Sequence, residues 1–329
     1  MAMIKLLTPR NRENIILLGQ EHIEHIKQPQ NMPVQRVDWL DLIDSGKDMS
    51  YPRHVSFSYE PPIDGEIVVT REGGETRVIK AHGGRAQMTN FRIGATYRWY
   101  ARAGWMTSET YTFSTDGQAP RMLFVEGISN VRDIGGFRTR DGGIVRQGMI
   151  YRTSEMDTHA NITEEGKRTL TEELGVRLDL DLRGINGEMC GAVLDRRRVK
   201  WVNYPMAAYT EIFCREQMER YRQTFELLSH REVYPLIAHC WAGADRTGTW
   251  LYILGGMLGV SADDLALDYE MSSFSRWGSR SRRSEQFVEF LERLCTYGDN
   301  VNDACAAFLA DCGVTAETMD RIRAILVEY

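Results

Sequence analysis

The stretch His239-Cys240-Trp241-Ala242-Gly243-Ala244-Asp245-Arg246-Thr247-Gly248 decides how this chain of 329 residues is organised. The short apolar run Pro235-Leu236-Ile237-Ala238 lies before it and is typical of a buried strand. An apolar block over residues 249–260 follows and is long enough for a buried helix, with Gly259 near its end. The sequence therefore predicts a strand, a tight loop that contains Cys240, and a helix.

Two side chains of this loop have complementary chemistry. Cys240 would lie at the N-terminus of the helix, where the helix dipole favours a thiolate and a bound anion. Arg246 follows six positions later, and its planar guanidinium can bind two oxygens of a phosphate. The N–H groups between them can bind the remaining oxygens, and they belong to Trp241, Ala242, Gly243 and Ala244. The pattern predicts a nucleophilic cysteine in a phosphate-binding loop.

The residues around this pair decide its interpretation. An isolated cysteine and arginine at this spacing would favour a buried structural cysteine beside a solvated arginine. His239, Gly243 and Thr247-Gly248 favour the catalytic interpretation. With them, the loop resembles that of the cysteine-dependent protein tyrosine phosphatase superfamily. It is most similar to a bacterial and fungal branch whose members have tyrosine, dual-specificity or phosphoinositide phosphatase activity.

Three further segments carry the same resemblance, which covers residues 124–329. Residues 130–136 and 148–154 resemble the two entry motifs of the branch, although the usual serine of the second is Thr153 here. Residues 181–184 resemble its Asp-Leu-Arg segment. Arg132 and Asp133 are interpreted as braces of the fold. The resemblance implies a phosphatase catalytic domain over residues 119–329, with an α/β fold in which helices flank a central sheet.

The resemblance also implies a role for each residue of the loop. Cys240 attacks phosphorus, Arg246 and the loop amides bind the phosphate oxygens, and Thr247 donates a hydrogen bond to the departing thiolate. His239 is a supporting residue that steadies the loop. No metal or other cofactor is expected, because Arg246 and the amides take the role that Mg²⁺ has in other phosphatases.

The proton donor is the least direct assignment. Many tyrosine phosphatases take it from a mobile Trp-Pro-Asp loop, but the corresponding segment here, Tyr204-Pro205-Met206, contains no Asp. Asp245, inside the loop, is therefore the predicted donor. The alternative is a structural carboxylate that Arg246 or a backbone N–H orients. Asp181, at the end of a predicted strand, is a candidate supporting carboxylate, and its alternative is a plain Asp–Arg ion pair.

The predicted reaction is hydrolysis of phosphotyrosine monoesters, with phosphoserine and phosphothreonine as further candidate substrates. The alternative is a phosphoinositide or inositol phosphate, attacked in the same way. Ala244 stands where the branch often has lysine, which weakens that alternative, although four arginines could compensate (Arg276, Arg280, Arg282 and Arg283). A phosphate-binding module without activity is the third hypothesis.

Composition limits the class of protein. Hydrophobic residues make up 43% and charged residues 26%, as in soluble globular proteins, and the length suits two domains. The net charge of −6 argues against a nucleic-acid-binding protein. No segment is long and apolar enough to span a membrane. The predicted partners are therefore the phosphorylated protein or phosphoinositide substrate.

All six cysteines lie in the second half of the chain and have no zinc-ligand spacing (Cys190, Cys214, Cys240, Cys295, Cys305 and Cys312). A disulfide framework is not expected in a domain of this size. A thiolate nucleophile requires reduced sulfur, which favours the cytoplasm. Export is the alternative, if a signal peptide has been removed.

Residues 1–118 are predicted to form an all-β sandwich, because several short strands alternate with polar turns. Residues 91–99 resemble the tyrosine corner of fibronectin type III domains, and residues 112–115 their last strand. An accessory role is expected, with a protein partner or the catalytic domain as binding partner. Residues 116–120 are a predicted linker.

Two predictions concern short local features. Residues 21–27 and 38–44 are predicted as short helices or an insertion. His22 and His25 could be a metal pair, but a solvated helix face is the preferred interpretation. Thr163, Ser261 and Thr315 are predicted helix caps.

Overall fold

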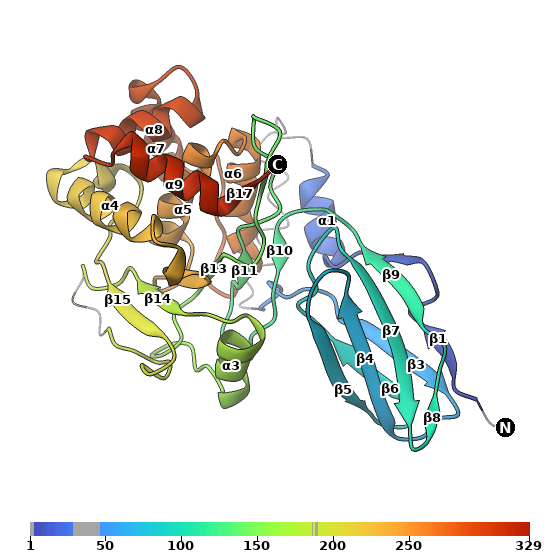
Figure 1. Cartoon of the computed structure of the whole chain (residues 1–329). Coiled ribbons are helices and arrows are strands. Elements are labelled where there is room, and N and C mark those ends of the chain that lie inside the picture. Colours follow the sequence, from blue (N-terminus) through green and yellow to red (C-terminus); the bar gives the residue numbers. More distant parts are fainter. Residues whose placement is uncertain (1–2, 29–46, 186, 188–189) are drawn as a thin grey trace. The chain divides into compact units, whose positions relative to one another are not determined.

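The computed structural model describes residues 3–28, 47–185, 187 and 190–329. These form two compact units. The first unit takes residues 1–20 and 52–124, and the second takes residues 21–51 and 125–329 (Figure 1). The N-terminal part of the chain therefore contributes to both units, and each is described by itself below.

The described part of the first unit is built on two sheets. One contains β1 (Lys5–Thr8), β3 (Val55–Glu60) and β6 (Arg85–Met88). The other contains, in order, β2 (Glu13–Ile15), β9 (Tyr111–Thr115), β7 (Thr96–Ala103), β4 (Gly65–Arg71) and β5 (Thr76–Ala81), with β8 (Met106–Thr107) paired to β7. Alternate residues of β3 and β7 are buried, as the pleat requires. The two sheets meet where the ring of Phe57 lies 5.1 Å from that of Trp99 and 5.9 Å from that of Phe113.

The second unit has a central sheet whose main strands are parallel. Its strands include, in order, β11 (Arg132–Asp133), β13 (Ile150–Thr153), β16 (Leu236–His239), β14 (Leu178–Asp181) and β15 (Lys200–Asn203). The last four are mutually parallel, and β11 is antiparallel to β13. Every residue of β13, β14 and β16 is buried, as in a parallel sheet covered on both faces. The α/β prediction for this part of the chain is confirmed.

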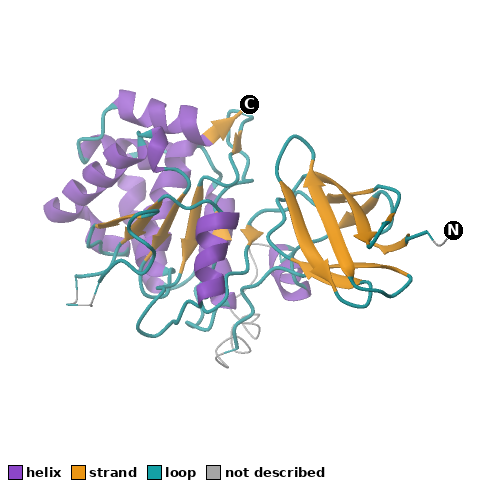
Figure 2. Ribbon diagram, turned by 60° about the horizontal axis from the view of Figure 1, so that its bottom comes forward, coloured by secondary structure: helices purple, strands orange, loops and turns teal. Residues whose placement is uncertain are grey.

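Helices surround these strands (Figure 2). They are α3 (Glu164–Arg168), α4 (Arg215–Leu228), α5 (Asp245–Leu258), α6 (Ala262–Glu270), α7 (Glu285–Leu294), α8 (Val301–Asp311) and α9 (Ala316–Leu326). A small ladder of β12 (Ile144–Val145) and β17 (Val327–Glu328) lies beside them. The caps at Thr163, Ser261 and Thr315 are confirmed, since each side chain accepts a bond from an N–H three residues on. Among the described helices, none is long and apolar enough to cross a bilayer.

The segment of residues 21–51 brings helix α1 (Gln20–Ile26) into the second unit. His22 is buried there, edge-on to Phe274 with ring centres 4.4 Å apart, and burial lowers the pKa of His22 to about 4. The N–H of Met49 donates to the carbonyl of Phe274 at 2.7 Å. A solvated helix face is therefore wrong for His22, because α1 covers an aromatic residue. The predicted helix over residues 38–44 lies outside the described residues.

Candidate active site

The segment that begins at Cys240 lies at the carboxyl end of β16, in the middle of the sheet. This strand ends at His239 and α5 begins at Asp245, so residues 240–244 connect the strand to a helix N-terminus, as the sequence predicts. Cys240 is buried, with 2% of its surface exposed. Ligands of α/β proteins collect at this edge of the sheet, and a helix N-terminus attracts anions.

The carbonyl groups of the loop are held by the surrounding protein. The side-chain amide of Asn130 donates to the carbonyl of Ala242 at 2.9 Å, and Arg152 Nη2 donates to that of Gly243 at 2.5 Å. The N–H of Glu155 donates to the carbonyl of Trp241 at 2.7 Å. Because these carbonyls are satisfied from outside, the loop can present its own N–H groups to an enclosed anion. This is the backbone arrangement that a phosphate site requires.

Glycine is required at position 243. Its φ is +65°, in the left-handed region, and a Cβ atom there would lie 2.0 Å from the carbonyl oxygen of Thr153. The carbonyl belongs to β13, so the loop closes directly against the neighbouring strand. Any side chain at this position would push the loop away from the strand that shapes it.

A buried charge cluster supports the residues that hold the loop. Asp268, on α6, accepts from Arg132 Nε at 2.7 Å and from Arg152 Nη1. Both arginine side chains are fully buried. Arg132 also donates to the side-chain oxygen of Asn130, so it acts on the loop through Asn130. Burial raises the pKa of Asp268, but the two guanidinium groups outweigh it and hold that pKa below its ordinary value.

Asp133 braces the entry motif, as predicted from the sequence. Its carboxylate accepts from the N–H of Gly135 at 2.9 Å and from that of Gly148 at 2.6 Å. The sequence interpretation of Arg132 as a brace also agrees with its contacts. Asn130, Arg152 and Asp268 were not predicted as site residues, although Asn130 and Arg152 lie in the two entry motifs that carry the resemblance.

His239 and Asp181 lie beneath the loop at the ends of adjacent strands. Asp179 Oδ1 lies 3.0 Å from His239 Nε2, and Asp181 Oδ1 lies 3.9 Å from Nδ1. Burial disfavours the charged imidazole, but the attraction of Asp179 outweighs it and raises the pKa of His239 to about 9. His239 is therefore a cation at neutral pH, placed next to Cys240 in the chain.

Asp181 is turned toward Arg183. It accepts from Arg183 Nε at 3.0 Å and from Nη2 at 2.9 Å, and Arg183 Nη1 also donates to Asp157 at 2.5 Å and Glu155 at 3.1 Å. Burial raises the pKa of Asp181, yet the bonds from Arg183 bring it below the ordinary value. These contacts match the alternative in which Asp181 forms an Asp–Arg ion pair. Arg183 also links Asp181, at the end of β14, to Glu155.

The His239–Asp179 pair predicts a pH dependence of stability. The pKa of His239 rises from 6.5 to about 9 on folding, so its contribution is complete below pH 6.5 and is lost as the pH rises through 9. We expect the free energy of unfolding, measured in urea, to fall by more than about 1 kcal/mol across this window. Asp179→Asn removes the attraction, so the free energy of unfolding of this variant should fall less with pH than that of the wild type. An equal fall in both proteins would contradict the pairing of His239 with Asp179.

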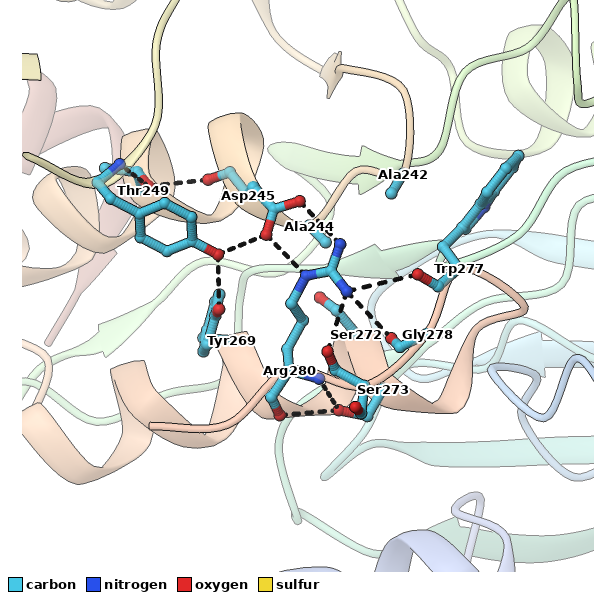
Figure 3. Close-up of polar contacts among 12 residues, drawn as sticks. Ala242, Ala244, Asp245, Thr249, Tyr269, Ser272, Ser273, Trp277, Gly278 and Arg280 are labelled. Carbon is cyan, nitrogen blue, oxygen red and sulfur yellow. Dashed lines mark hydrogen bonds and ion pairs between the residues drawn. The ribbon is translucent and has the colours of Figure 1, made fainter. Parts of the chain in front are cut away.

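Asp245 is paired with a basic residue that lies outside the loop (Figure 3). Arg280 donates to its carboxylate through Nε at 2.7 Å and through Nη2 at 2.8 Å. The Tyr209 hydroxyl donates to the same carboxylate and lies 2.7 Å from the Tyr269 hydroxyl. Burial raises the pKa of Asp245, but Arg280 outweighs it and holds that pKa below its ordinary value. The basic stretch that contains Arg280 is interpreted from the sequence as a solvated connector or as a lid that binds an anionic substrate, and neither interpretation predicts this pairing.

Two of the four arginines that could compensate for Ala244 are thus bound to carboxylates. Arg280 binds Asp245, and Arg282 donates to Glu270 through Nη2 at 2.8 Å.

The Thr247 hydroxyl is buried and has no hydrogen-bond partner in the described part of the chain. Arg246 is half-buried in the first turn of α5. Among the described residues, no group of three or more His, Cys, Asp or Glu side chains could hold a metal ion.

Comparison with known proteins identifies the family of the chain. Residues 123–328 match the model of a family described as the tyrosine phosphatase family, and the chain belongs to this family. It is a phosphatase, and thus a hydrolase. A protein of Cupriavidus necator, provisionally named a tyrosine-protein phosphatase, is 28% identical over 204 residues, which cover 52% of this chain and 72% of that protein.

One solved structure shows a more distant likeness. It is the core catalytic domain of the PP-IP phosphatase SIW14 from S. cerevisiae, in complex with citrate. The identity is 17% and the TM-score 0.32, over 45% of this chain and 86% of that one. A likeness of this size does not bear on the substrate.

Proposed function

We propose that this phosphatase hydrolyses phosphotyrosine monoesters through a cysteinyl-phosphate on Cys240. The observation that carries the proposal is the loop between β16 and α5. Its carbonyls are bonded from outside by Asn130, Arg152 and Glu155, so the N–H groups of the loop can face an enclosed phosphate. The proposed nucleophile lies at the start of this loop, which leads into the N-terminus of the buried helix α5.

The reaction then has two steps. The Cys240 thiolate attacks phosphorus, an S–P bond forms, and the P–O bond to the leaving group breaks. Arg246 and the loop amides hold the charge on the equatorial oxygens. Water next attacks the cysteinyl-phosphate, which releases inorganic phosphate and the thiolate. The buried hydroxyl of Thr247 is available to donate to that thiolate, and the His239 cation stabilises it.

Asp245 is the proposed proton donor to the leaving oxygen, and it recovers a proton from the attacking water. In the structure Arg280 keeps this carboxylate ionised. A dianionic phosphate bound in the loop would raise the pKa of Asp245 by charge repulsion and compete for Arg280. Protonation of Asp245 therefore has to follow from substrate binding.

Asp245→Asn is expected to slow substrates with poor leaving groups most. General acid catalysis contributes about 10²–10⁴ in rate, so kcat/KM for phenyl phosphate, which reports the first step only, should fall by at least about 100-fold. The loss of kcat/KM on p-nitrophenyl phosphate should be much smaller, because p-nitrophenolate leaves without a proton. Tyr209→Phe is the matched control, since it removes one bond to the same carboxylate and keeps the acid. Equal losses on both substrates would assign Asp245 to a structural role with Arg280.

Substrate class is tested by initial rates on a panel. The panel contains p-nitrophenyl phosphate, phosphotyrosine, phosphoserine and phosphothreonine peptides, and mono- and polyphosphorylated inositols. We expect kcat/KM to be highest for phosphotyrosine peptides. Ala244 adds no charge to the loop, and Arg280 and Arg282 are bound to carboxylates, which favours a substrate with one phosphate. Inositol phosphates as the best substrates would overturn this choice, and no turnover at all would support a binding module.

The first unit is proposed to be a fibronectin type III-like accessory domain that binds a protein. Two sheets in contact support this, together with the hydroxyl of Tyr97, which accepts from the N–H of Arg92 at 2.9 Å. A bond of this kind defines a tyrosine corner.

The proposed mechanism requires a reduced Cys240, which makes a reducing compartment such as the cytoplasm the proposed location.

A further inference from the structure

Beside the phosphate loop, three segments bring aromatic side chains together. Trp241 directly follows the nucleophile, His159 lies in the segment after β13, and Trp277 lies between α6 and α7. The ring of His159 is stacked on that of Trp241, with centres 4.5 Å apart and planes 17° from parallel. Trp277 meets Trp241 edge-on at 6.5 Å. These three residues are called the aromatic platform below.

The platform is held in place by polar contacts. The buried carboxylate of Glu155 accepts from the N–H of His159 at 2.9 Å and lies 2.8 Å from its Nδ1. Arg276 Nη2 donates to the carbonyl of His159 at 2.6 Å. The N–H of Glu155 also donates to the carbonyl of Trp241 at 2.7 Å. Glu155 therefore holds both His159 of the platform and the phosphate loop. The geometry of the platform is therefore fixed before a ligand arrives.

This fixed platform is nevertheless partly open to solvent. Trp241 is 41% exposed and the His159 side chain 56% exposed. A single exposed tryptophan is ordinary on a protein surface. Stacked rings next to a phosphate-binding loop are different. Because their side chains are already ordered, little conformational entropy is lost when an aromatic ligand binds to them.

One cation accompanies the platform. The guanidinium of Arg276 lies over the ring of Trp277, 4.7 Å from its centre. Arg276 is exposed, and within the described residues it forms no ion pair with a carboxylate. The carboxylates of Glu155 and Asp157 close to the platform are bound instead by Arg183. Positive charge is thus available at this rim of the site.

We infer that the aromatic platform binds the phenyl ring of a phosphotyrosine residue, and that Arg276 binds an acidic side chain next to it in the peptide. The inference rests on the proposed function and names its substrate more closely. An aromatic leaving group gains from stacking on Trp241, whereas an alkyl phosphate does not. Trp241, His159, Trp277 and Arg276 are then specificity-determining residues of the reaction.

The test compares variants on matched substrates. Trp277→Ala, which changes no residue of the loop, should raise KM for a phosphotyrosine peptide by about 3- to 10-fold, the value of one aromatic contact, with kcat within about twofold. Trp277→Phe should restore most of the loss. The inhibition constant of inorganic phosphate reports the loop alone and should stay within about twofold in both variants. Arg276→Gln should abolish the preference for peptides with acidic neighbours over neutral ones.

The outcomes separate this inference from the proposed function. An unchanged KM in Trp277→Ala, or an equal rise in the inhibition constant of phosphate, would overturn the platform. If Trp277→Ala does not fold, His159→Ala, which also changes no residue of the loop, carries the same expectation. If the wild-type enzyme does not hydrolyse phosphotyrosine peptides but hydrolyses inositol phosphates, the proposed function itself is overturned.

Discussion

Replacement of Cys240 by serine is expected to reduce kcat by at least about a thousandfold on every substrate, as loss of a nucleophile does in other enzymes. Cys240 follows the His239 cation and begins the loop that leads into the N-terminus of α5, and a cation and a helix N-terminus both attract negative charge. A serine hydroxyl stays protonated in the same place, and the proposed mechanism provides no base to activate it. The measurement is steady-state hydrolysis of p-nitrophenyl phosphate.

The Cys240→Ser variant should still bind phosphate, because the N–H groups of the loop and Arg246 are unchanged. A phosphotyrosine peptide should therefore bind Cys240→Ser with close to the wild-type affinity and remain intact. Cys295→Ser is the matched control, since Cys295 is an exposed free cysteine, and it should keep full activity. Activity of Cys240→Ser equal to that of the wild type would remove the cysteine from the reaction.

Asp268→Asn is expected to lower the free energy of unfolding by about 3–5 kcal/mol. Arg132 and Arg152 are fully buried, and Asp268 binds both of them. The amide keeps the shape but removes the negative charge, so two buried guanidinium groups are left uncompensated. Activity should fall as well, since Arg152 holds the carbonyl of Gly243 and Arg132 holds Asn130.

Urea unfolding gives this free energy directly. Asp263→Asn, on the same helix, is the matched control: its side chain is 61% exposed and lies 3.5 Å from Arg282. A surface pair of this kind contributes less than about 1 kcal/mol. Two variants of similar stability would show that the cluster around Asp268 contributes little to the fold.

The strand, loop and helix around Cys240 could be predicted from the sequence because their signals are local. An apolar run, a glycine and a buried helix follow one another within residues 235–260, and each of them alone limits the backbone. The structure adds the reason for Gly243, which is the carbonyl of Thr153 at 2.0 Å from its would-be Cβ. Thr153 belongs to β13, which lies about a quarter of the chain away in sequence, so no local pattern could reveal the contact.

The partners of charged residues could not be predicted for the same reason. Asp268 stands in an ordinary amphipathic helix, and nothing near it in the sequence shows that Arg132 and Arg152 surround it. Arg280 belongs to a basic stretch that resembles a solvated or substrate-binding segment, but it binds Asp245. His22 has polar neighbours in sequence and an aromatic one in space. Such contacts depend on the tertiary fold alone.

The central claim is a covalent phosphate on Cys240, and rapid acid quench during turnover tests it most directly. A phosphotyrosine peptide is mixed with excess enzyme, the reaction is stopped within one turnover, and peptides of the enzyme are analysed by mass spectrometry. We expect one phosphoryl group on the peptide that contains Cys240, and none in Cys240→Ser. Phosphate on another residue, or turnover without any phosphorylated enzyme under conditions that trap a known cysteinyl-phosphate, would contradict the mechanism.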